Sequence, residues 1–140
     1  MRLLGLDIGE RRVGVAVSDP AGRVATPLKV LPGPISADVR ALVRIIDDYE
    51  PGLIVIGLPL SMDGSEGPQA ALVRQEGTRL AEMLSVPITY CDERLSSVAA
   101  QRAMADAGAD SRARRGSVDM VAAAIMLQTY LDANQERPHD

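Results

Sequence analysis

Residues 2–18 read RLLGLDIGERRVGVAVS, and this stretch decides the fold. Its first part, Arg2–Ile8, is a short apolar run, which predicts a strand. In Arg12–Ser18 three valines recur at every second position, and this alternation predicts a second strand. Because only Gly9-Glu10-Arg11 separates the two, they are expected to form an antiparallel hairpin.

Beyond the hairpin, one more strand is expected before helices and strands alternate. The expected elements are a strand over Arg23–Leu31, a helix from Ser36 or Asp38 (either can cap it) to Tyr49, a strand over Leu53–Ile56, a loop over Gly57–Gly67, a helix over Pro68–Leu84, a strand over Ile88–Cys91, a helix over Ser96–Ala107, a polar break over Gly108–Gly116 and a helix over Ser117–Ala133. Pro27 places the third strand near an edge, because proline cannot donate to a ladder.

This order predicts an α/β fold with a five-stranded mixed sheet flanked by helices, which is the RNase H-like order. The 140 residues suffice for one domain with a substantial core. We therefore expect a single domain over residues 1–134 and a flexible C-terminal tail over 135–140.

Composition directs any chemistry to carboxylates. The single histidine, His139, lies near the C-terminus, which makes histidine catalysis and His-rich zinc sites improbable. The single cysteine, Cys91, cannot form an intrachain disulfide, which fits a reducing cytoplasm. No signal-peptide pattern precedes the first strand, and no stretch has the length of a membrane span.

The aromatic content and the net charge of the chain bear on a nucleic-acid partner in two ways. With three Tyr, no Phe and no Trp, the chain has few rings on which bases could stack, so phosphate contacts would have to hold a nucleic acid. The net charge of −4 argues mildly against such a partner, unless part of the acidic charge is neutralised by bound metal.

Three acids stand in positions that suggest a metal site. Asp7 interrupts an apolar strand, Glu93 directly follows the fifth strand, and Asp119 lies at the start of the last helix. Each also has a structural explanation: solvent exposure or a turn cap for the first, a helix N-cap at Asp92 near the second, and the helix dipole for the third. Carboxylate oxygens suit Mg²⁺ or Mn²⁺, and one or two such ions can drive phosphodiester hydrolysis.

Four segments together resemble the YqgF/RuvX family of Holliday-junction-resolvase-like proteins. They are LDIGERRVGVAVSD at residues 6–19, VIGLPLSMDGSEGP at 55–68, DERLSS at 92–97, and DMVAA at 119–123 continuing through LQTYLD at 127–132. The resemblance implies an RNase H-like fold, a cytoplasmic location, and a metal-dependent nuclease that processes the end of pre-16S ribosomal RNA during ribosome biogenesis. It also implies that Asp7, Glu93 and Asp119 are catalytic carboxylates that bind the metal.

One feature departs from resolvases proper, which place an acid at the end of the strand after the first helix. Here that strand leads into Gly57-Leu58-Pro59, with no acid. Either Glu93 replaces it from the next strand, or Asp63 or Glu66 reaches the site from the loop. We favour Glu93 because a strand end is better fixed than a loop.

Arginines close to the acidic motifs are candidates for binding substrate phosphates. The candidate substrate-binding residues are Arg11, Arg12, Ser65, Arg94, Arg114 and Arg115, with Arg112 also nearby. The ordinary explanation is a solvated face for the arginines and a turn for Ser65. Gly5, Gly9 and Gly14 are explained either by turn geometry and small volume or by close approach of a phosphate backbone.

Three other functions compete with an RNA-processing nuclease. An Asp-x-Gly hairpin also opens actin-like and sugar-kinase-like ATPases, but these need two such domains around a cleft. A catalytically silent RNA-binding module for ribosome assembly would leave the acids structural. A true Holliday junction resolvase for recombination and repair would need a homodimer to cut two strands symmetrically, whereas the processing enzyme could be a monomer.

Overall fold

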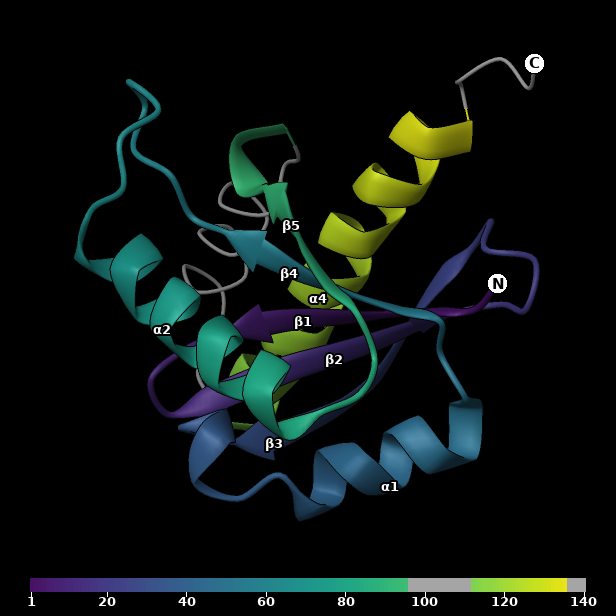
Figure 1. Ribbon diagram of the computed structural model, residues 1–140. Coiled ribbons are helices and arrows are strands. Elements are labelled where there is room, and N and C mark those ends of the chain that lie inside the picture. Colours follow the sequence, from purple (N-terminus) through teal and green to yellow (C-terminus); the bar gives the residue numbers. More distant parts are fainter. Residues whose placement is uncertain (96–111, 136–140) are drawn as a thin grey trace.

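The computed structural model describes residues 1–95 and 112–135, with side chains described for 1–95 and 118–134 (Figure 1). Its centre is a five-stranded mixed sheet in the order β3-β2-β1-β4-β5. The strands are β1 Leu3–Ile8, β2 Arg12–Ser18, β3 Ala25–Pro32, β4 Leu53–Leu58 and β5 Ile88–Asp92. The first three are antiparallel neighbours, while β4 runs parallel to β1 and β5 parallel to β4. The predicted fold class, hairpin and edge position of the third strand are confirmed.

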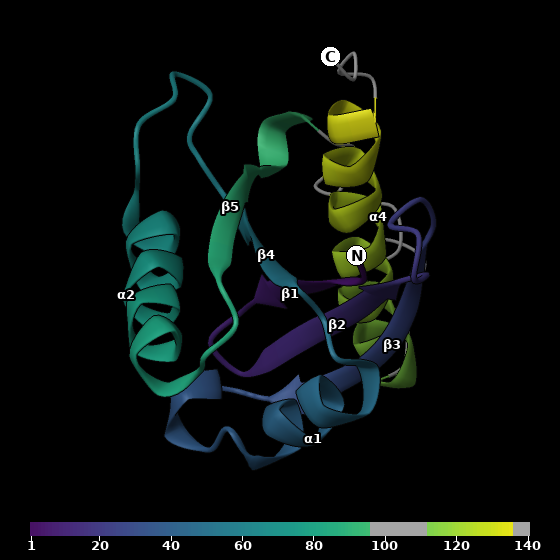
Figure 2. The same ribbon diagram turned by 45° about the vertical axis from the view of Figure 1, so that its right-hand side comes forward.

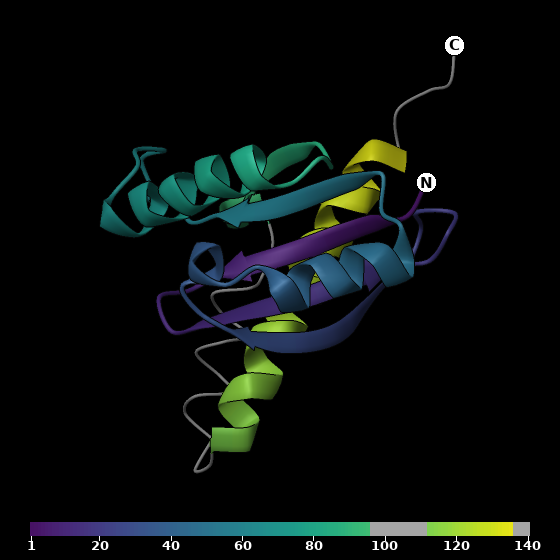
Figure 3. The same cartoon turned by 60° about the horizontal axis from the view of Figure 1, so that its bottom comes forward.

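Helices cover both faces of the sheet (Figures 2 and 3). The helices α1 (Arg40–Tyr49) and α2 (Pro68–Met83) lie on one face, and α4 (Arg112–Gln135) crosses the other. Two short 3₁₀ turns, η1 (Ile35–Ala37) and η2 (Glu93–Leu95), precede α1 and follow β5. No helix in the described residues is both long enough and apolar enough to span a bilayer.

Alternation along the strands divides the core into two layers. Leu4 and Leu6 of β1 pack with the α1–α2 side, whereas Leu3 packs with the α4 side. Since successive side chains of a strand point to opposite faces, Asp7 shares the α4 face with Leu3 and Gly5. The predicted catalytic acid therefore lies under α4.

The ends of β4 and α1 are among those that differ from the sequence prediction. The fourth strand continues to Leu58, so Gly57 belongs to a strand and not to the loop. The helix α1 begins at Arg40 with Val39 in the N-cap position, and Asp38, one residue earlier, accepts from the Arg40 amide at 3.1 Å. Ser36 lies instead in η1, which takes up part of the region expected to be helical.

The last helix begins earlier than predicted. It starts at Arg112 and runs through Gly116, so the predicted break is wrong over residues 112–116. A glycine inside a helix costs only about 1 kcal/mol, which a long packed helix can overcome. Gln135 ends α4, so the helix reaches into the predicted tail; the predicted Ser96–Ala107 helix and residues 136–140 lie outside the described residues.

Candidate functional site

The site is organised around Asp7, whose neighbours on the adjacent strands are glycines. Asp7 is 7% exposed and pairs with Gly14 of β2. On the other side, Leu6 pairs with Ile56 of β4, so the next residue, Gly57, comes level with Asp7. Neighbouring strands lie about 4.8 Å apart, so these positions form a short row across the α4 face of the sheet. We call Gly14, Asp7 and Gly57 the glycine–aspartate row.

The two glycines of this row make room for the other two predicted acids. A Cβ added to Gly14 would collide with the backbone carbonyl of Asp119 on α4. A Cβ added to Gly57 would lie 2.6 Å from Oε1 of Glu93. The fold therefore brings Asp119 and the Glu93 carboxylate to either side of Asp7, although the three are far apart in sequence. Gly14 is required for its small volume rather than for turn geometry, since its φ is not positive.

Glu93 occupies an environment in which its charge is costly. It is the first residue of η2, directly after β5. Burial raises the pKa of its carboxyl, and the negative charge of Asp92 raises it further. Burial likewise raises the pKa of the neighbouring Cys91 thiol to about 11, with contributions from both acids. A cation beside Glu93 would offset this cost.

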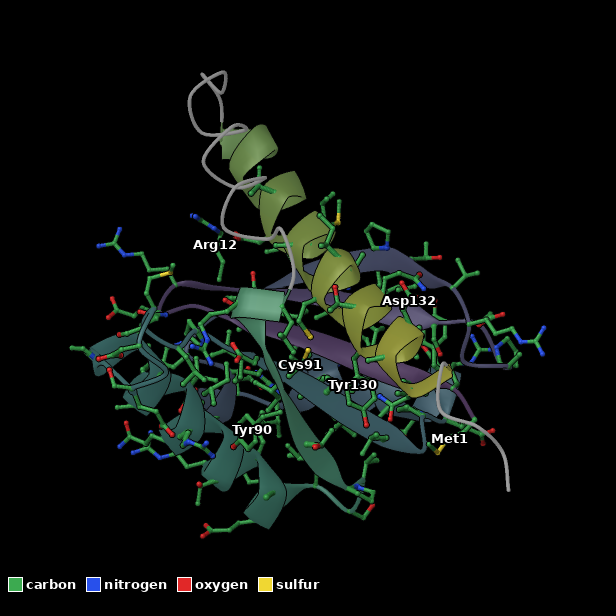
Figure 4. All side chains as sticks on the ribbon, turned by 90° about the horizontal axis from the view of Figure 1, so that it is seen from above. Met1, Arg12, Tyr90, Cys91, Tyr130 and Asp132 are labelled. Carbon is green, nitrogen blue, oxygen red and sulfur yellow. The ribbon has the colours of Figure 1, made fainter. Side chains whose placement is uncertain are left out.

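Asp119 is held by an arginine from the opposite end of the chain. Arg12 Nε donates to Asp119 Oδ2 at 2.7 Å, and the side chains are 46% and 15% exposed, respectively. Figure 4 shows Arg12 beside the N-terminal half of α4, with Cys91 on the strand beneath the helix. Because α4 starts at Arg112, Asp119 lies about two turns inside the helix and not in its first turn. The helix-dipole explanation for this acid is therefore wrong.

A hollow of about 380 Å³ opens beside the Arg12–Asp119 pair. It is lined by Gly9, Glu10, Arg11, Arg12, Gln69 and Asp119. Two predicted phosphate-binding arginines thus meet one predicted metal ligand at the same opening. Gln69 was not singled out from the sequence. It is the second residue of α2, and neither its residue type nor its spacing from the acids marks it in the sequence.

Arg94, another predicted substrate-binding residue, holds a loop. It forms an ion pair with Asp92 at 2.7 Å, which lowers the pKa of that carboxyl, and it donates to the Met62 carbonyl at 3.3 Å. The segment between β4 and α2 is thereby tied to the end of β5, next to Glu93.

The acids of that loop have partners within or beside it. Asp63 accepts hydrogen bonds from the Ser65 amide at 2.9 Å and from its hydroxyl at 2.6 Å. Glu66 accepts from Arg74 Nε at 2.7 Å. Both loop acids thus take part in contacts of the loop and of α2, whereas Glu93 is the acid whose carboxylate lies next to Gly57.

Arg114 and Arg115 were expected directly before the Asp119 helix. The structure places their backbone within the first turn of α4, and their side chains are outside the described part. They therefore lie N-terminal to Asp119 on the same helix.

The donors of the site suit a divalent cation, but they do not surround a common point. Asp7, Glu93 and Asp119 offer the hard carboxylate oxygens that divalent cations such as Mg²⁺ prefer. The Glu93 carboxylate occupies the space that a side chain at position 57 would fill. Within residues 1–95 and 118–134, no three Asp, Glu, His or Cys side chains form a group that could hold a metal ion. Asp119 is instead engaged by Arg12.

Solved structures share the fold of this chain. The chain is similar to Thermus thermophilus RuvC in complex with a Holliday junction substrate, with a TM-score of 0.59, 18% identity, and 97% and 96% of the two chains covered. It is also similar to the fowlpox virus Holliday junction resolvase, with a TM-score of 0.53, 12% identity, and coverages of 95% and 99%. At these identities the likeness establishes the RNase H-like fold.

The family described as "RuvX: Holliday junction resolvase" matches residues 1–133, and the chain belongs to this family. A relative from Roseiflexus sp. (strain RS-1), named "Putative pre-16S rRNA nuclease", is 44% identical over 135 residues, or 96% of each chain. A relative of the same name from Myxococcus xanthus (strain DK1622) is 44% identical over 141 residues, covering 100% of this chain and 92% of its own. The chain is accordingly a hydrolytic nuclease, of a kind that generally depends on divalent metal and acts on nucleic acid.

Proposed function

We propose that Asp7, Glu93 and Asp119 hold Mg²⁺ or Mn²⁺ and that the chain hydrolyses phosphodiester bonds at the end of pre-16S ribosomal RNA, in the cytoplasm. The names of relatives that are 40–44% identical over nearly the full chain support the RNA substrate. The class of reaction follows from the family, and the position of the Glu93 carboxylate next to Gly57 supports the choice of acids.

The observation that carries the proposal is the position of Glu93 over Gly57, level with Asp7. A side chain at position 57 would exclude the Glu93 carboxylate from this place. The last pair of the β4–β5 ladder, Leu58 with Asp92, brings Glu93 directly to the end of the neighbouring strand. Glu93 can thereby replace the acid that β4 itself lacks.

Each group of the site has a distinct task in this proposal. Asp7 is fixed by the central strand of the sheet, so it provides the rigid reference point of the site. Arg11, Arg12 and Gln69 line the adjoining hollow and can donate to substrate phosphates. When bound, a divalent ion supplies charge stabilisation at the phosphate and a lower pKa for the attacking water.

Four further residues are proposed as substrate contacts. Ser65 lies in the segment between β4 and α2, which Arg94 ties to the end of β5 through the Met62 carbonyl. Arg114 and Arg115 precede Asp119 on α4 by one to two turns. A phosphate backbone that enters the hollow would continue along this side of the helix.

The test compares wild type with Asp7→Asn on labelled precursor ribosomal RNA and on a four-way DNA junction, each with Mg²⁺, Mn²⁺ or EDTA. Asp48→Asn is the matched control, because Asp48 is exposed on α1, across the sheet from the site. We expect metal-dependent cutting by wild type and the control, and none by a folded Asp7→Asn protein, with folding checked by circular dichroism. Equal cutting by the two variants would exclude the carboxylate mechanism, and no cutting under any condition would favour an RNA-binding assembly module.

Junction resolution is the second candidate, because the family description itself refers to a Holliday junction resolvase. Symmetric cutting of two strands would require a homodimer, whereas trimming one RNA end would not. Faster cutting of the four-way junction than of the RNA, by a protein that is dimeric in solution, would move this candidate ahead.

A further inference from the structure

The Arg12–Asp119 pair joins the two activities that the proposed function needs, metal binding and phosphate binding. Arg12 is the first residue of β2 and Asp119 lies on α4, 107 positions later in the sequence. Arg12 and Gly14 stand on the same face of β2, two residues apart, and Asp119 lies against Gly14. The ion pair therefore sits at the end of the glycine–aspartate row.

Arg12 and a divalent ion compete for the same carboxylate. The guanidinium Nε already takes a lone pair of Asp119 Oδ2 at 2.7 Å. An ion bound to Asp119 would bring a double positive charge next to the guanidinium, and like charges at such separations repel strongly. Among the described side chains Asp119 is paired with Arg12 and belongs to no group of three acids that could hold a metal ion.

A substrate phosphate can reach Arg12 without disturbing the core. The Arg12 side chain is 46% exposed and lines the hollow together with Arg11 and Gln69. Guanidinium groups bind phosphate oxygens in a bidentate manner, which makes a phosphodiester a suitable alternative partner. Glu10 and Asp119 line the same opening, so its formal charges balance, and direct hydrogen bonds from the arginines would hold a phosphate there.

We propose that Arg12 couples nucleic-acid binding to metal binding: it occupies Asp119 in the free enzyme and moves to a substrate phosphate, which releases Asp119 for the metal. The proposal rests on the proposed function, since it needs Asp119 to be a metal ligand. Coupling of this kind is reciprocal, so the nucleic acid raises metal affinity and the metal raises nucleic-acid affinity by the same factor. Arg12 thus binds the substrate phosphate directly and affects the metal through Asp119.

The experiment measures Mn²⁺ affinity by isothermal titration calorimetry, with and without a four-way DNA junction whose phosphorothioate linkages resist hydrolysis. In wild type, the junction should tighten Mn²⁺ binding by at least about fivefold, the lower end of ordinary coupling. Arg12→Gln should bind Mn²⁺ at least about fivefold more tightly than wild type when no nucleic acid is present, and the junction should add little further.

Arg11→Gln is the matched control, because Arg11 lines the same hollow and, among the described contacts, makes no ion pair with Asp119. An equal gain of Mn²⁺ affinity in both variants would overturn the proposal, because the loss of any positive charge near the site would then explain the gain. The proposal would also be overturned if Arg12→Gln left Mn²⁺ affinity unchanged or weakened it. Arg12 would then have no effect on the metal site, or would hold Asp119 in place for the metal instead of competing with it. Failure of wild type to bind Mn²⁺ with or without the junction counts against the proposed function itself.

Discussion

Replacing Gly57 with alanine tests whether a missing side chain positions Glu93. The new Cβ would lie 2.6 Å from Glu93 Oε1 and 3.2 Å from Met126 Cγ. Ordinary contacts of a Cβ begin at 3.4 Å, so the carboxylate oxygen has to retreat by about 0.8 Å. Gly57 lies in a strand and has no positive φ, so alanine adds no backbone strain.

The expected loss is in activity rather than in stability. A catalytic group displaced by about 1 Å can lower the rate about 100-fold, so we expect kcat/KM to fall by roughly 10- to 100-fold. Both crowded atoms belong to side chains that can shift, so overpacking should cost only about 1 kcal/mol. The reduced freedom of the unfolded chain offsets part of that cost, by about 0.4–1 kcal/mol.

The assay combines initial rates on the substrate that wild type cuts with thermal unfolding followed by circular dichroism. Gly67→Ala is the control glycine substitution, because its Cβ would meet only Ser61 Oγ at 3.6 Å, an ordinary contact. A Gly57→Ala enzyme that keeps its activity within twofold of wild type would refute the argument. A stability loss above about 3 kcal/mol would show that the crowding is not absorbed by side chains.

Two further predictions concern stability. Gly14→Ala should lose about 3 kcal/mol or more in urea unfolding, because its Cβ meets backbone atoms of Asp119 that cannot turn aside; stability equal to wild type would mean that α4 is not packed against β2 here. Ser36→Ala should lose roughly 1–3 kcal/mol near neutral pH, because Glu76, 2% exposed, loses the bond from the Ser36 hydroxyl at 2.6 Å and keeps only the one from the backbone amide at 3.1 Å. Burial raises the pKa of the Glu76 carboxyl, but the bonds from Ser36 and Arg79 together lower it by more than burial raises it. The ionised carboxylate therefore stabilises the folded protein fully above pH 4.5, and this contribution is lost as the pH falls through the lowered pKa. The difference between Ser36→Ala and wild type should therefore narrow in acid, and a gap independent of pH would contradict the role of the charge.

Local pattern was sufficient to predict the strands of the sheet, its first hairpin and its edge strand. The period-two valines and the short turn predicted the β1–β2 hairpin, and Pro27 predicted the edge strand. These features depend on neighbours in sequence, where backbone geometry and side-chain alternation act directly. The limits of α4 differ from the prediction because one glycine costs a helix only about 1 kcal/mol, so Gly116 does not interrupt it.

The arrangement of the site was decided by tertiary structure. Sequence alone identified Asp7, Glu93 and Asp119 as candidates, but it placed Gly57 in a loop and offered no partner for Arg12. The space beside Asp7 and the ion pair across 107 positions both depend on strand order and on how α4 crosses the sheet. Residue types along the chain indicate which chemical groups are present. The distances between side chains that are remote in sequence are set only when the helices pack on the sheet.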